Sequence, residues 1–123
     1  MPKTILFIED ESALQKTFGE IFKQEGYEMT SALDGEVGLR LAKTKKPDLI
    51  LLDLILPKIN GFDVLKQLKE DPDTKEIPVI VLTNLEGMQD IEKVIGLGAT
   101  TYLIKANYSL VEVMEKIKKA LGE

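Results

Sequence analysis

The chain has 123 residues, a common size for one domain, and such a domain buries enough surface to fold without a disulfide or a structural metal. It contains neither cysteine nor histidine, which excludes disulfide scaffolds, catalysis by either residue, and metal ligation by sulfur or imidazole, so that any metal must be bound by oxygen. The net charge of −5 disfavours direct binding to nucleic acid, because affinity for phosphate comes mostly from positive charge.

The sequence predicts neither a signal peptide nor a membrane span. A strand pattern begins within a few residues of Met1, with no signal-peptide pattern before it. The longest apolar run, "LILLDLIL", is interrupted by Asp53 and is far shorter than the roughly 18 residues that a membrane span needs. We therefore expect a cytoplasmic protein that makes no contact with a membrane.

Five runs of residues predict strands: 4–9, 28–33, 48–53, 78–83 and 101–105. The first, third and fourth runs are apolar at both alternating sets of positions. This pattern is typical of central strands in a parallel sheet that helices cover on both faces. The second and fifth runs are more mixed, as expected of edge strands.

Helical patterns fill the segments between the strands and follow the last one. The first helix begins at Ser12, where Ser12 and Gln15 have the spacing of a capping box, and it ends at Gly26. The other predicted helices span residues 34–43, the segment between Gly61 and Pro72, residues 88–97 and residues 109–121.

Strands that alternate with helices through short links predict one α/β domain over residues 1–123. The expected architecture is a doubly wound, flavodoxin-like sandwich in which five parallel strands are flanked by five helices. The sequence contains no internal repeat, low-complexity segment or linker.

Polar residues occur where the predicted strands end. Glu9 and Asp10 end the first strand, Asp53 the third, Thr83 the fourth and Lys105 the fifth. Sites in open parallel sheets form at the carboxyl ends of strands. If the first and third strands are neighbours, three carboxylates converge and repel one another unless a cation compensates. Mg²⁺ prefers such hard oxygen ligands, so the pattern predicts a magnesium site beside a lysine.

Each of these residues taken alone also has a structural explanation. An acid after a strand is commonly a turn or helix-start residue, which is the interpretation we keep for Glu11 and for Ser12. Thr83 suits a strand, and Lys105 suits an exposed strand end. Asp53 is different, because apolar residues flank it on both sides and an unpaired buried acid is costly. The joint placement of the set is what indicates a site.

The same positions carry a resemblance to a known family over the whole chain. In "DLILLDLILPKING", Asp53 is followed by Pro57 and Gly61; "VIVLTN" contains Thr83, and "GATTYLIK" ends at Lys105. With the acidic pair after the first strand, the chain resembles the receiver domain of two-component response regulators, of the stand-alone chemotaxis type. The resemblance implies the strand order 2-1-3-4-5.

The resemblance also implies a phosphoryl-transfer chemistry. Asp53 would accept a phosphoryl group from the phosphohistidine of a histidine kinase or phosphotransfer protein. Glu9, Asp10, Asp53 and the backbone carbonyl of Ile55 would bind Mg²⁺. Lys105 would neutralise charge on the transferring group, which is where most of the catalysis in phosphoryl transfer lies.

The family's switch would use Thr83 and Tyr102. Thr83 would move toward the phosphoryl group, Tyr102 would change rotamer, and the face of the fourth helix, fifth strand and fifth helix would change to regulate a downstream protein. Alternatively, Tyr102 is an edge-strand aromatic whose hydroxyl lies in water. We expect a monomer or weak dimer that catalyses only its own phosphorylation and dephosphorylation and is not otherwise an enzyme.

Three residues depart from the family pattern. Ala106 stands where the family usually has a proline after a cis bond, so we expect a trans Lys105–Ala106 bond and a shifted loop. Asn84 stands where the family usually has a small residue. Ile55 lies where the family's side chain faces the hydrolytic water, and an apolar side chain predicts slow autodephosphorylation.

Other functions remain open to different degrees. A pseudo-receiver would keep the fold as an interaction module that is not phosphorylated, with Ala106 and Asn84 as its marks. A flavodoxin-like electron carrier is disfavoured, because "EDES" after the first strand repels phosphate. A phosphatase would need an acid two residues after Asp53, where Ile55 stands. The sequence leaves open whether the chain acts alone or was cut from a longer regulator.

Overall fold

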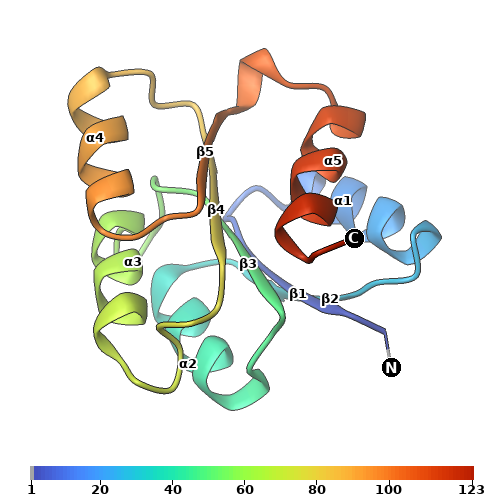
Figure 1. Ribbon diagram of the computed structural model, residues 1–123, viewed down its shortest axis with the longest axis horizontal. Coiled ribbons are helices and arrows are strands. Elements are labelled where there is room, and N and C mark those ends of the chain that lie inside the picture. The colour runs from blue at the N-terminus through green and yellow to red at the C-terminus, as the bar shows by residue number, and fades with distance from the viewer. Residues whose placement is uncertain (1) are drawn as a thin grey trace.

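The computed structural model describes residues 2–123 and has a parallel sheet at its centre (Figure 1). The strand order is β2-β1-β3-β4-β5, and each neighbouring pair is parallel. The predicted fold and strand order are therefore confirmed.

The elements follow one another in strict alternation. The strands are β1 (Thr4–Ile8), β2 (Glu28–Ala32), β3 (Leu49–Leu52), β4 (Val79–Thr83) and β5 (Thr101–Ile104). The helices are α1 (Ser12–Gln24), α2 (Gly35–Lys45), α3 (Gly61–Glu70), α4 (Met88–Gly96) and α5 (Leu110–Ala120), with a short 3₁₀ helix, η1 (Lys105–Asn107), before α5.

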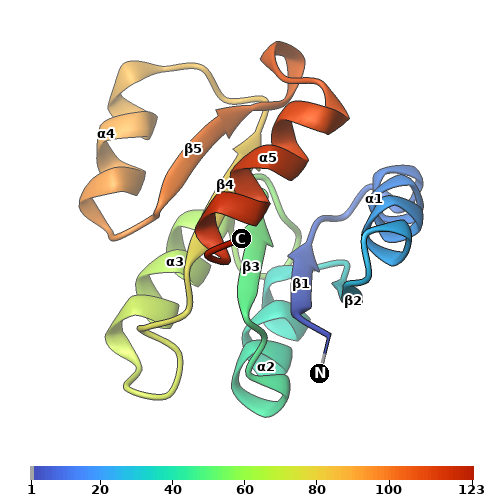
Figure 2. The same ribbon diagram turned by 45° about the vertical axis from the view of Figure 1, so that its right-hand side comes forward.

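Helices cover both faces of the sheet, as the apolar central strands require. Figures 1 and 2 show α1 and α5 on one side and α2, α3 and α4 on the other. Along β1, Phe7 faces α1, and its ring packs edge-on against that of Phe18 with 5.2 Å between the ring centroids. Leu6 and Ile8 belong to the core on the opposite face of the sheet. All residues of β3 and β4 are buried, whereas β2 and β5 lie at the edges, as predicted.

The strand register positions the polar residues that follow the strands. Ile8 of β1 pairs with Leu52 of β3, so Glu9 and Asp53 leave adjacent strands at the same level. Thr83 is the last residue of β4 and pairs with Ile104. The strands β1, β3 and β5 each end one residue before the predicted limit, and Glu9, Asp53 and Lys105 therefore lie just beyond the regular ladder.

The predicted capping box at the start of α1 is wrong. The N-cap residue is Glu11, and its side chain makes no capping hydrogen bond. The Gln15 side chain points into the protein and is buried. A buried carbonyl cluster nearby competes for its amide hydrogens. A capping box does form at α5, where Ser109 and Glu112 exchange hydrogen bonds.

The trans Lys105–Ala106 bond predicted from Ala106 is confirmed, and the shifted loop stays a prediction. The described residues contain no cis peptide bond, so the Lys105–Ala106 bond is trans. The chain continues from β5 directly into η1, which carries Lys105 at its first position. No helix within residues 2–123 combines the length and apolar character that crossing a membrane requires.

Gly61 allows the loop after β3 to fold back on Asp53. A β-carbon at Gly61 would lie 2.4 Å from the Asp53 carbonyl oxygen and 2.4 Å from Leu54 Cα, and both are main-chain atoms that have little room to move. The Gly61 N–H also donates to the Leu54 carbonyl oxygen at 2.9 Å. This close approach explains the glycine of the "DLILLDLILPKING" segment.

We expect Gly61→Ala to lower the free energy of unfolding by about 2 kcal/mol or more, because overpacking against main-chain atoms forces the loop to shift. Urea titration followed by circular dichroism measures the effect. The matched control is Gly96→Ala in α4, where an added β-carbon meets nothing within 4 Å. That change should stabilise by up to about 1 kcal/mol. Equal effects at the two positions would contradict the steric explanation.

Candidate functional site

The polar residues at the strand ends converge at one edge of the sheet. In Figure 2 the arrows of β1, β3, β4 and β5 all point toward this edge. Glu9 follows β1, Asp53 follows β3 and Lys105 follows β5. Residues far apart in the sequence thus meet in a small volume.

Lys105 bridges two buried carboxylates. Its Nζ atom lies 2.5 Å from Glu9 Oε1 and 3.0 Å from Asp53 Oδ2. The side chains of Glu9 and Asp53 are only 1% and 6% exposed, and that of Lys105 is 16% exposed. A single ammonium thus serves two carboxylates in a poorly solvated site, which leaves excess negative charge there.

The main chain fixes the second oxygen of each carboxylate. Asp53 Oδ1 accepts hydrogen bonds from the Leu54 N–H at 2.7 Å and the Ile55 N–H at 3.3 Å. Glu9 Oε2 accepts one from the Glu11 N–H at 3.1 Å. Both carboxylates are therefore held in place before any ligand arrives, so little reorganisation is needed when charge arrives.

The pKa values of Glu9 and Lys105 reflect this distribution of charge. Burial raises the pKa of Glu9; Lys105 and the Glu11 N–H oppose the rise only in part, and the charge of Asp53 adds to it. Burial alone lowers the pKa of Lys105, but its hydrogen bonds to Glu9 and Asp53 and their charges outweigh burial and raise its pKa. Lys105 is therefore firmly cationic at neutral pH.

Asp10 completes a cluster that suits a divalent cation. One carboxylate oxygen from each of Glu9, Asp10 and Asp53 lies within 4.8 Å of the others. Glu9 and Asp53 are buried, whereas Asp10 is exposed, so the cluster has an open side. Three oxygen donors with access for water fit Mg²⁺, which keeps several of its waters.

Thr83 and Tyr102 lie on the neighbouring strands β4 and β5 and share a hydrogen-bonding partner, Leu85. Thr83 is fully buried, and its hydroxyl accepts a weak hydrogen bond from the Leu85 N–H at 3.5 Å. The Tyr102 hydroxyl donates to the Leu85 carbonyl oxygen at 2.9 Å. Burial, together with the charges of Asp90 and Asp53, raises the pKa of Tyr102. The alternative interpretation of Tyr102, with its hydroxyl in water, is therefore wrong.

The residues that depart from the family pattern lie at the rim. Asn84 is exposed next to Thr83, and the Ile55 side chain is 58% exposed. Lys105 reaches both carboxylates even though Ala106 follows it. One contributor, Gln15, was not among the predicted site residues; it is buried, and its Nε2 atom donates to the Glu9 carbonyl oxygen. In the sequence it has the spacing of a capping residue near the start of an amphipathic helix.

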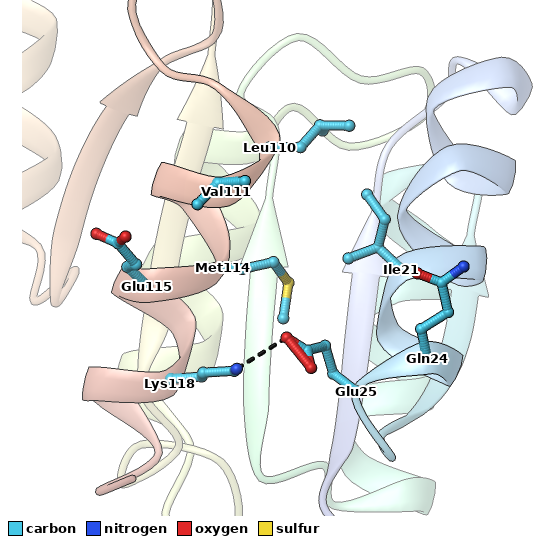
Figure 3. Close-up of a pocket in the computed structure, with 8 residues that line it drawn as sticks. All are labelled: Ile21, Gln24, Glu25, Leu110, Val111, Met114, Glu115 and Lys118. Atoms are coloured by element: carbon cyan, nitrogen blue, oxygen red, sulfur yellow. Dashed lines mark hydrogen bonds and ion pairs between the residues drawn. The ribbon is translucent and has the colours of Figure 1, made fainter.

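A groove between α1 and α5 lies apart from this site. It has a volume of about 520 Å³. Figure 3 shows Ile21 and Met114 pointing into it, with the Lys118–Glu25 ion pair at one end and an Nζ–Oε1 distance of 2.8 Å. None of the clustered carboxylates lines this groove, so its apolar walls are separate from the polar site.

Comparison with known proteins decides the family. The profile described as "Response regulator receiver domain" matches residues 5–118. The chain belongs to this family. The polar-differentiation response regulator DivK of Brucella anthropi is 36% identical over 123 residues, which cover 100% of this receiver domain and 99% of DivK. The DNA-binding regulator RpaA of Synechocystis is 38% identical over 98% of this chain but only 49% of RpaA.

Solved receiver domains have the same architecture. A CheY-like receiver domain from Methanospirillum hungatei superposes with a TM-score of 0.92 at 25% identity, covering 99% of this chain and 95% of that one. The receiver domain of a sensor histidine kinase from Pseudomonas aeruginosa gives 0.89 at 25% identity, with both chains covered completely. That structure has a magnesium ion coordinated in its active-site cleft.

These matches give the general function. This receiver domain is a phosphorylatable response regulator of two-component signalling. Receiver domains of this kind interact with histidine kinases and with downstream targets. Here the acidic cluster of Glu9, Asp10 and Asp53 supplies the oxygen donors that a metal such as Mg²⁺ needs.

We expect Lys105→Met to lower the free energy of unfolding by about 3 kcal/mol at pH 7.5 without added metal, because two buried carboxylates lose their counter-charge. The loss should shrink as the pH falls toward 5. The pKa of Glu9 is already raised in the folded state, and losing Lys105 raises it further. Protonation of Glu9 therefore favours the folded protein as the pH falls through that raised value. Urea titrations at the two pH values measure this.

The matched control is Lys118→Met, which breaks the partly exposed ion pair with Glu25. Such a pair contributes less than about 1 kcal/mol, so this variant should remain near wild type at both pH values. A loss for Lys105→Met that did not depend on pH would contradict the electrostatic explanation.

Proposed function

We propose that Asp53 is the phosphoryl acceptor, that transfer requires Mg²⁺, and that the donor is the phosphohistidine of a histidine kinase or phosphotransfer protein. The observation that carries the proposal is the contact of Lys105 with both Glu9 and Asp53 beside Asp10. A nucleophilic carboxylate is here oriented next to a cation and next to a set of oxygen donors.

The transfer exchanges one bond for another. A carboxylate oxygen of Asp53 forms a bond to phosphorus while the phosphorus–nitrogen bond of the donor imidazole breaks, and the released imidazole takes a proton from solvent. The protein contributes position and charge rather than covalent chemistry of its own. Lys105 already contacts Asp53 Oδ2 and lies where it can neutralise the incoming negative charge.

Four groups would hold the metal: the carboxylates of Glu9, Asp10 and Asp53 and the backbone carbonyl of Ile55. Bound Mg²⁺ supplies further neutralisation of phosphoryl charge. Lys105 alone cannot balance the three carboxylates, so the site carries excess negative charge. The same excess charge is what draws a divalent cation in.

The switch we propose passes through Leu85. Thr83 and Tyr102 both hydrogen-bond to the main chain of Leu85, in the link between β4 and α4. A phosphoryl group on Asp53 would give the Thr83 hydroxyl a stronger acceptor than its 3.5 Å contact. The Thr83 hydroxyl would then no longer accept from the Leu85 N–H, and the hydrogen bond from the Tyr102 hydroxyl to the Leu85 carbonyl oxygen would change. The face of α4, β5 and α5 would rearrange and alter binding of a downstream protein.

We further propose that the protein acts in the cytoplasm as a monomer or weak dimer. It would catalyse no reaction other than its own phosphorylation and dephosphorylation. The cluster faces solvent through Asp10, which gives a phosphohistidine access from outside.

We expect acetyl phosphate to add one phosphoryl group to the protein, and the addition should require both Mg²⁺ and Asp53. Intact mass spectrometry of the wild type, with and without EDTA, and of Asp53→Asn measures the adduct. Asp73→Asn is the matched control, because Asp73 is exposed in the turn after α3 and should not matter. Absence of both an adduct and Mg²⁺ binding in the wild type would instead support a pseudo-receiver.

We expect Ile55→Asn to shorten the lifetime of the phosphorylated protein several-fold. An amide can orient the attacking water by hydrogen bonding, whereas the exposed Ile55 side chain cannot. The decay of the adduct after removal of acetyl phosphate measures the lifetime. Val111→Asn makes the same chemical change at an exposed position in α5 and should leave the decay unchanged. Equal decay in all three proteins would exclude a role for Ile55 in hydrolysis.

A further inference from the structure

Gln15 ties together the carboxyl ends of two neighbouring strands. The residue is 5% exposed, and its Nε2 atom lies 2.8 Å from the Phe7 carbonyl oxygen, 3.1 Å from that of Glu9 and 3.2 Å from that of Ala32. Buried main-chain carbonyls need donors, and here a side chain shares its two amide hydrogens among three of them.

These contacts fix the main chain on both sides of Glu9. The Glu9 N–H donates to the Ala32 carbonyl oxygen at 2.9 Å, and the Glu9 carbonyl oxygen accepts from Gln15 at 3.1 Å. The Glu9 carbonyl and the Asp10 N–H belong to one planar peptide unit. The hydrogen bond from Gln15 therefore sets the plane from which the exposed Asp10 residue departs.

The chemistry of glutamine suits this position beside a cation site. An amide donates hydrogen bonds without adding charge, so it leaves the negative charge of Glu9, Asp10 and Asp53 unchanged. A lysine or arginine here would place a second cation close to Lys105 and weaken the attraction for a divalent metal. An apolar residue would leave three buried carbonyl oxygens without this donor.

We propose that Gln15 is a positioning residue for the metal site, which it preorganises by holding the Glu9–Asp10 peptide in place. This inference rests on the proposed binding of Mg²⁺ by that pair. Groups that orient metal ligands from behind commonly change affinity when they are removed, even though they never touch the metal.

The test is a calorimetric titration of the full chain with MgCl₂. Gln15→Met keeps the length of the side chain and removes the donor, and we expect it to weaken Mg²⁺ binding about tenfold. At saturating MgCl₂, phosphorylation by acetyl phosphate should return toward the wild-type rate, because Gln15 acts on metal affinity and not on Asp53.

The matched control is Thr74→Val. Thr74 is also buried, and its hydroxyl donates to the Leu68 carbonyl oxygen at 2.7 Å, near the end of α3. Both changes remove a buried side-chain donor from main-chain carbonyls, so both should lower stability to urea. Only Gln15→Met should weaken Mg²⁺ binding. Gln15→Asn, a milder change that shortens the reach of the amide, should give an intermediate affinity and serves if the methionine variant fails to fold.

Two results would overturn the inference in different ways. If the Gln15 variants lose stability but bind Mg²⁺ within twofold of the wild type, Gln15 has a purely structural role and the proposed function stands. If the wild type itself binds no Mg²⁺, the proposed metal-dependent function fails, and the positioning role fails with it.

Discussion

The ammonium of Lys105 lies between the carboxylates of Glu9 and Asp53, and this contact joins three strands that are far apart in the sequence. Glu9 and Lys105 are separated by 96 positions, and Asp53 and Lys105 by 52. The contact is electrostatically incomplete, because one cation faces two buried carboxylates with a third, Asp10, at the rim. That deficit of positive charge makes the site costly to the folded protein and would attract a cation.

The surrounding structure tolerates this cost because the central strands of the sheet are apolar. The strands β1, β3 and β4 are buried on both faces, and two separate cores lie above and below them. Burial of that size offsets the loss from a few poorly solvated charges. Glu9, Asp53 and Lys105 lie one position beyond their strands, where the N–H groups of Glu11 and Leu54 are free to donate to the carboxylates of Glu9 and Asp53.

The Thr83 side chain, which would carry a signal, makes weaker hydrogen bonds than the carboxylates of Glu9 and Asp53, which would receive it. Within residues 2–123, the Asp53 carboxylate accepts three hydrogen bonds and the Glu9 carboxylate two, whereas the Thr83 hydroxyl accepts one, from the Leu85 N–H at 3.5 Å. The Leu85 carbonyl oxygen also accepts a hydrogen bond from the Tyr102 hydroxyl, so one residue of the link after β4 contacts both side chains. The weak hydrogen bond between Leu85 and the Thr83 hydroxyl suits a switch, because a modest new interaction of the hydroxyl suffices to break it.

The sequence by itself determined the strands, the helices, the strand order by family resemblance, and the identity of the residues that meet at the sheet edge. These features are local or periodic: apolar runs specify buried strands, and side chains at strand ends must lie at one edge. The trans bond at Ala106 was likewise predictable from the chemistry of a single residue.

Only the tertiary structure decided the partners. Gln15 has the spacing of a capping residue, yet its amide donates to three carbonyl oxygens at the ends of β1 and β2, because buried acceptors cost more to leave unpaired than exposed ones. Tyr102 lies in an edge strand, yet the main chain of Leu85 supplies an acceptor for its hydroxyl. Both outcomes depend on backbone groups brought together by folding, and no spacing along the chain records where a carbonyl group will point.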